Sequence, residues 1–92
     1  MVSLVVVYVQ DLEACVDFYG GLGLEFARER HGGGPVHYAA VLPGGGVFEL
    51  YPATEEKRTG AVRLGFVLGD GEGRRVLRDP EGRIVEVCGG TA

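Results

Sequence analysis

Three charged residues interrupt segments of the chain that are otherwise mostly apolar. Glu49 lies within VFELY, Glu86 lies within IVEVC, and Arg63 opens RLGFV. Two carboxylates brought together can serve as an acid/base pair or supply oxygen ligands to a metal ion. An arginine between them can instead neutralise both through bidentate hydrogen bonds. These three residues are therefore the first candidates for a functional site.

The permanent positive charge of Arg63 disfavours a bound cation beside it. We expect Arg63 either to neutralise Glu49 or Glu86 in a structural ion network, or to face an anionic group of a ligand. A divalent metal held by Glu49 and Glu86 is possible but disfavoured, and we expect no cofactor.

Aromatic and sulfur side chains accompany these charges. Tyr8 and Tyr51 offer phenol rings that can stack on flat ligands. Cys88 follows Glu86 by two positions, but no lysine or histidine lies near it in sequence to activate the thiol. His31 lies in a glycine-rich loop and is expected to be solvated. His37 opens a strand and can face a cleft, although we interpret it as structural rather than catalytic.

Glycine and proline clusters divide the chain into the elements that must position these residues. An apolar stripe at positions 12, 15, 16 and 19 predicts a short helix that Asp11 caps and the glycines at 20 and 21 end. Runs rich in β-branched residues predict strands at residues 2–9, 24–30, 36–42, 47–51, 62–68, 75–78 and 83–88, with turns at 69–73 and 79–82. The predicted fold class is therefore α+β.

Each predicted strand has two faces that differ in character. One face is wholly apolar and should pack against the helix. The other is mixed, and a mixed face of this kind fits a ligand cleft, a subunit interface or ordinary surface. Its members are Leu4, Val6, Tyr8, Val47, Glu49, Tyr51, Arg63, Gly65, Val67, Ile84, Glu86 and Cys88.

Composition excludes several classes of protein. The 92 residues carry a formal net charge of −4 with no long basic run, so a nucleic-acid partner is not expected. The chain lacks the run of about 20 apolar residues that crossing a membrane requires. The two cysteines match no zinc-binding spacing, and we expect a cytoplasmic protein with reduced thiols.

Several motifs resemble one known family in the right order along the chain. They are the opening strand with DLEA and FYGGLGL, the segments FEL and RLGFV, and the ending RDPEGRIVE. Together they resemble the glyoxalase/bleomycin-resistance/extradiol-dioxygenase (vicinal oxygen chelate) family. The resemblance implies one domain over residues 1–92, with a βαβββ module at 1–51, a reduced second module at 61–88 and an open half-barrel sheet. It also implies that the cleft is commonly completed by dimerisation or by a tandem module. The second module is truncated here, because the family usually carries a helix and a further strand between residues 68 and 74.

The resemblance also implies where a metal would bind. Its four ligand positions fall on Leu4, Glu49, Arg63 and Glu86, so two carboxylates are present and both imidazoles are absent. We therefore predict a small-molecule binding protein without a metal, in a sequestering or accessory role, that forms a homodimer. One alternative is a metal-dependent lyase or dioxygenase that uses Glu49 and Glu86. The other is a vestigial domain whose mixed face serves dimerisation.

Overall fold

The computed structural model describes residues 1–69 and 73–89. Its elements follow the predicted order, and they are β1 (Leu4–Val9), α1 (Leu12–Gly21), β2 (Phe26–Glu29), β3 (His37–Val41), β4 (Val47–Pro52), β5 (Arg63–Val67), β6 (Arg74–Arg78) and β7 (Ile84–Cys88). The predicted α+β class is confirmed, with a βαβββ module followed by a reduced module of strands. The turn expected at residues 69–73 lies mostly outside the described residues.

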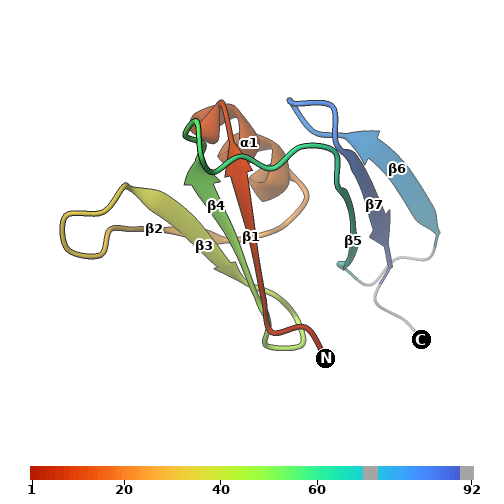
Figure 1. Ribbon diagram of the computed structural model, residues 1–92. Coiled ribbons are helices and arrows are strands. Elements are labelled where there is room, and N and C mark those ends of the chain that lie inside the picture. The colour runs from red at the N-terminus through yellow and green to blue at the C-terminus, as the bar shows by residue number, and fades with distance from the viewer. Residues whose placement is uncertain (70–72, 90–92) are drawn as a thin grey trace.

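The strands form two sheets with the same pattern of strand pairing (Figure 1). In sheet A the order is β1-β4-β3-β2, and in sheet B it is β5-β7-β6. In both, the first strand of the module pairs in parallel with the last, while the remaining pairs are antiparallel. β1 and β5 are therefore edge strands of their own sheets.

The helix begins as predicted and ends differently. The Asp11 side chain accepts a hydrogen bond of 3.1 Å from the backbone N–H of Ala14, which confirms the N-cap. The two glycines expected to end the helix lie inside it, and the left-handed residue is Gly23, with φ of +116°. None of the helices in residues 1–69 and 73–89 combines the length and the apolar character needed to cross a membrane.

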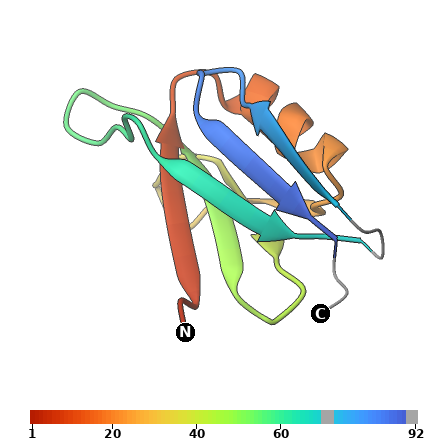
Figure 2. The ribbon, with the colours of Figure 1, turned by 90° about the vertical axis from the view of Figure 1, so that its right-hand side faces the viewer.

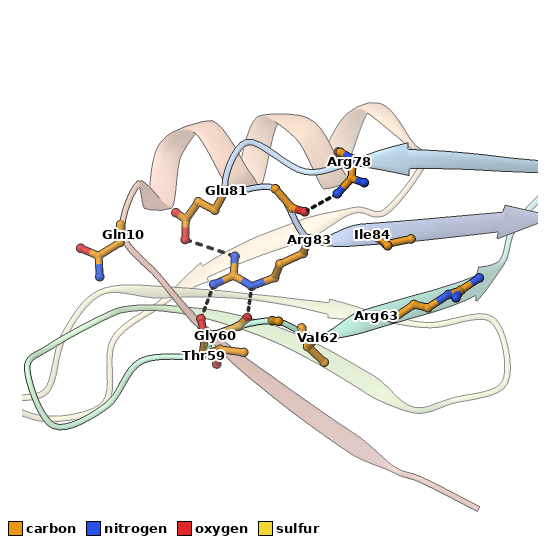
Figure 3. Close-up of a pocket in the computed structure, with 11 residues that line it drawn as sticks. Gln10, Thr59, Gly60, Val62, Arg63, Arg78, Glu81, Arg83 and Ile84 are labelled. Carbon is orange, nitrogen blue, oxygen red and sulfur yellow. Dashed lines mark hydrogen bonds and ion pairs between the residues drawn. The ribbon is translucent and has the colours of Figure 1, made fainter.

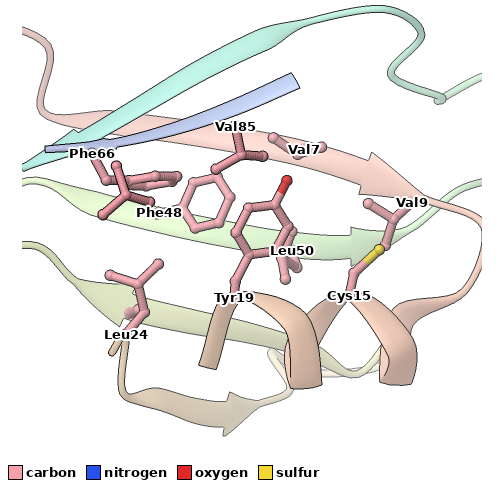
Figure 4. Close-up of a cluster of buried hydrophobic side chains, with 11 residues drawn as sticks. Val7, Val9, Cys15, Tyr19, Leu24, Phe48, Leu50, Phe66 and Val85 are labelled. Atoms are coloured by element: carbon pink, nitrogen blue, oxygen red, sulfur yellow. The ribbon is translucent and has the colours of Figure 1, made fainter. Parts of the chain in front are cut away.

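The apolar faces of both sheets share one core with α1 (Figure 4). The rings of Phe48 in sheet A and Phe66 in sheet B lie 5.2 Å apart, and Tyr19 of α1 contacts both. When the molecule is turned by 90°, sheet B lies in front of sheet A (Figure 2). Because side chains alternate along a strand, the mixed face of each sheet must point away from this core. We call these the outer face of sheet A and the outer face of sheet B.

Candidate functional site

The predicted site residues fall into two groups. Tyr8, Glu49 and Tyr51 alternate with core residues of β1 and β4, so they lie on the outer face of sheet A. The other three, Arg63, Glu86 and Cys88, lie on the outer face of sheet B. One copy of the chain thus places the two groups on faces that point away from each other. The shared Phe48–Phe66 contact is the physical reason, because it turns both apolar faces inward.

A row of rings crosses the outer face of sheet A. Tyr8 and Tyr51 are register partners with ring centroids 5.7 Å apart. The next ring is that of His37, which stacks on Tyr51 at 4.1 Å and 7°. Partial burial, together with the nearby Glu49 carboxylate, raises the pKa of the Tyr51 phenol. Tyr51 therefore stays a neutral, stackable ring across the physiological pH range.

Glu49 lies on the same face, two residues before Tyr51 on β4. Its register partners are Val6 on one side and Ala39 on the other. In the part of the chain that the structure describes, no arginine, lysine or histidine forms an ion pair with Glu49. A half-buried carboxylate between small apolar neighbours is a suitable anchor for a cationic group.

The charges on sheet B neutralise one another. The Arg63 Nε donates a 2.7 Å hydrogen bond to Glu86, and Arg74 also pairs with Glu86. Both arginines, with the Arg63 hydrogen bond foremost, lower the pKa of the Glu86 carboxyl. Of the two partners expected for Arg63, the structure shows Glu86 and not Glu49. Arg74 was not expected, because residues 69–73 were assigned to a turn and the next strand to 75–78. Cys88 is a half-buried free thiol at the end of β7.

A groove of about 670 Å³ opens beside Arg63 on this side of the molecule (Figure 3). Val62 and Ile84 give it apolar walls, and the segment 59–61 forms its rim. The Arg83 guanidinium fixes this rim by donating to the carbonyls of Thr59 at 2.6 Å and Gly60 at 3.2 Å. The volume lies within the range of small-molecule sites, about 300–1,000 Å³.

A buried polar network supports the groove from behind. Asp79 accepts hydrogen bonds from the Tyr19 hydroxyl at 2.7 Å and from the Arg83 side chain at 3.3 Å. Burial alone would raise the pKa of Asp79, but these bonds and two from backbone N–H groups outweigh it and lower the pKa. Glu81 also accepts a 3.1 Å bond from Arg83 and a 2.7 Å bond from the backbone N–H of Asp11. The network thus joins the β6–β7 turn, α1 and the 59–61 rim.

The structure also brings together three residues that sequence reasoning did not combine. Glu29, His31 and His37 place one ligand atom each within 4.8 Å of the others, at the loop end of the β2–β3 hairpin. His31 was expected to be solvated, and it is 74% exposed, whereas His37 is buried. The available signal was the hairpin itself, because a turn centred near residue 33 sets Glu29 opposite His37.

The residues present do not fit the metal site that the family resemblance implies. Leu4 has no donor atom, and Arg63 is a cation. Glu86 is already neutralised by two arginines, and Glu49 lies on the other outer face. We therefore derive no chemistry through a metal at these positions.

Solved structures of this fold resemble the chain over nearly its full length. TnmS3, an antibiotic binding protein from Streptomyces sp. CB03234, is 19% identical with a TM-score of 0.68, covering 99% of this chain and 96% of its own. A glyoxalase/dioxygenase from Nostoc punctiforme is 18% identical with a TM-score of 0.69, covering 100% and 92%. A lactoylglutathione lyase from Agrobacterium tumefaciens is 21% identical with a TM-score of 0.66, covering 98% and 93%. At these identities the likeness establishes the fold alone.

The sequence itself carries the family assignment. No curated protein matches the chain. The profile of the Glyoxalase/Bleomycin resistance protein/Dioxygenase superfamily, however, matches residues 2–72, which is well over half of the sequence. The chain therefore belongs to the Glyoxalase/Bleomycin resistance protein/Dioxygenase superfamily.

Proposed function

We propose that this protein binds a flat organic molecule bearing a positive charge, in a sequestering or accessory role in the cytoplasm. The observation that carries the proposal is the environment of Glu49 on the outer face of sheet A. This carboxylate has apolar register partners, Val6 and Ala39, and lies beside the stacked rings of Tyr51 and His37. A positive charge on the ligand would pair with Glu49 while its flat part stacks on Tyr51.

We further propose that a second copy of the chain closes this site. The outer face of sheet A carries the acidic Glu29 and Glu49, whereas the outer face of sheet B carries Arg63, Arg74 and Arg78. Apposing the acidic face of one copy with the basic face of another is electrostatically favourable. Exposed apolar side chains, including Leu4, Val41, Val67 and Val76, lie on the same two faces. The groove beside Arg63 would then form the second wall of a shared cleft.

The comparisons are consistent with this role at the level of the fold, because one structural neighbour is an antibiotic binding protein. A lyase or dioxygenase reaction through Glu49 and Glu86 gains no support from the geometry, because Arg63 and Arg74 already neutralise Glu86.

The proposal is tested by titrating the protein with a panel of cationic aromatic antibiotics while following tyrosine emission. Replacing Tyr51 by leucine should weaken the saturable binding by roughly 5- to 30-fold, which corresponds to about 1–2 kcal/mol of lost cation–π contact. Tyr38→Leu is the matched control, because Tyr38 lies in the same sheet but its hydroxyl donates to Glu13 of α1, on the helix side. Equal losses in both variants, or no saturable binding across the panel, would contradict the proposal.

The proposed dimer is tested separately by sedimentation velocity at rising protein concentration. Glu49→Arg should weaken association, because it places a cation on the face that meets the arginines of sheet B. A wild-type chain that remains monomeric at high concentration would refute the shared cleft while leaving ligand binding by one face to be judged by the titration.

A further inference from the structure

The cluster at the loop end of the β2–β3 hairpin has the composition of a transition-metal site. It contains two imidazoles and one carboxylate, a set of three protein ligands that commonly leaves the fourth position on Zn²⁺ open. The cluster lies on β2, β3 and their connecting loop, away from the four positions that the family resemblance implies.

The distances between the candidate ligand atoms fit a single ion. Glu29 Oε1 lies 3.2 Å from His37 Nε2 and 3.6 Å from His31 Nε2. Two ligands in a tetrahedron with metal–ligand bonds of about 2.0–2.1 Å are separated by about 3.3–3.4 Å. The two pairs that include Glu29 therefore already stand near the spacing that tetrahedral coordination requires, and the third pair, His31 with His37, lies within 4.8 Å.

The buried member of the cluster is held in the orientation that a metal ligand needs. His37 is only 1% exposed, and its Nδ1 lies 3.2 Å from the carbonyl oxygen of Pro35. A carbonyl can only accept, so Nδ1 carries a proton and donates it to Pro35, while Nε2 faces Glu29 Oε1 at 3.2 Å. Metal-binding histidines typically donate their other ring N–H to a backbone carbonyl in this way. Stacking on Tyr51 fixes the ring plane, and the Tyr51 hydroxyl lies 3.3 Å from Nε2.

A carboxylate oxygen and an imidazole nitrogen face each other in the cluster. His37 Nε2 lies 3.2 Å from Glu29 Oε1, and a metal ion bound between them would take both atoms as ligands. Within the described ranges neither lysine nor arginine forms an ion pair with Glu29, in contrast to Glu86.

From these observations we propose that Glu29, His31 and His37 bind a divalent transition metal of the zinc type. His31 is 74% exposed in its side chain, so the ion enters from solvent and keeps its fourth position open. That position lies on the outer face of sheet A, on the same row as Tyr51. The proposal does not depend on the proposed ligand, because it needs only Glu29, His31 and His37 to hold an ion and makes no use of Glu49.

The test uses the full chain without a histidine tag, stripped with a chelator and titrated with Zn²⁺ by calorimetry. We expect one ion per chain and a rise in melting temperature, because the ion binds the folded state. His31→Ala and Glu29→Gln should each weaken binding by about 100-fold or more, since even outer-sphere changes cost about 10- to 100-fold. Glu25→Gln is the matched control, an exposed carboxylate just before β2, and should bind like the wild type.

Circular dichroism of the metal-free variants separates lost ligands from lost fold, and both substitutions lie at partly or largely exposed side chains. The spectrum of the Co²⁺-loaded protein should show no thiolate charge-transfer band, because neither cysteine takes part. The absence of stoichiometric binding would overturn the proposal. Binding that survives both substitutions, or that is lost in Glu49→Gln and Glu86→Gln instead, would overturn it as well.

Discussion

Replacing Arg83 by methionine should destabilise the protein more than any exposed arginine substitution. The Arg83 side chain is almost fully buried and pairs with both Asp79 at 3.3 Å and Glu81 at 3.1 Å. It also donates to the backbone carbonyls of Thr59 and Gly60. Removing one partner of a buried ion pair costs about 3–5 kcal/mol, because the remaining charge is left without compensation. A chain of this length is stable by about 5–14 kcal/mol in total, so the change removes about a fifth of it or more.

The assay is urea unfolding followed by circular dichroism and tyrosine emission. For a slope of about 1.3 kcal/mol/M, the midpoint of Arg83→Met should fall by about 2–4 M. Arg78→Met is the matched control, because exposed Arg78 makes one hydrogen bond of 3.1 Å, to the Gly82 carbonyl. If Arg83→Met leaves no folded baseline, Arg83→Lys keeps the charge but not the planar fork and should fall between the two. Midpoints for Arg83→Met and Arg78→Met that agree within error would refute the reasoning.

Three other expectations follow from the same geometry. Hydrogen bonds hold the pKa of Asp79 below its ordinary 3.8, although burial opposes them. The ionised Asp79 therefore contributes its full stabilisation above about pH 4, and this stabilisation is lost as the pH falls through the lowered pKa of the folded protein. Melting curves from about pH 5 to 2.5 should show this loss, and Asp79→Asn should flatten it. Burial, with neighbouring carboxylates, raises the pKa of the Cys15 thiol to about 12. A thiol reagent added to the native protein should therefore label Cys88 first and Cys15 only after unfolding. Mass spectrometry of the labelled protein would show the order. Gly82 has φ of +85°, so Gly82→Ala should cost about 1–2 kcal/mol in urea unfolding, whereas Gly60→Ala, with open space around it and no positive φ, should cost little.

Local patterns predicted the elements well because the physical causes are themselves local. Runs of β-branched residues and turn signals placed every strand to within about two residues. The start of one strand mattered for the site, since Arg74 opens β6 one residue before the predicted strand and supplies the second cation on Glu86. The C-terminal end of α1 was misplaced because glycine permits a left-handed residue without requiring one. Gly20 and Gly21 remain helical, and Gly23 takes the positive φ.

The arrangement of the site could not be predicted in the same way. Alternation assigned Glu49 and Glu86 correctly to mixed faces, but it carries no information on how two sheets are turned toward each other. That relation depends on long-range packing, here the contact of Phe48 with Phe66. The histidine cluster was within reach, because the hairpin register follows from its turn, yet each histidine was judged alone rather than with Glu29 opposite.

The reduced second module explains why the two outer faces are free. Its described residues, 61–69 and 73–89, include no helix to cover the apolar face of sheet B. That face packs instead on the first module, where Tyr19 of α1 contacts both Phe48 and Phe66 and donates its hydroxyl to Asp79. The helix α1 thus helps to cover both sheets. The apolar face of sheet B packs against sheet A and α1 rather than against a helix of its own module. A ligand site can then form on an outer face or between the outer faces of two copies. Such an assembly would bring together the Glu49 carboxylate of one copy, which has no ion pair within the described residues, and the arginines of sheet B of the other.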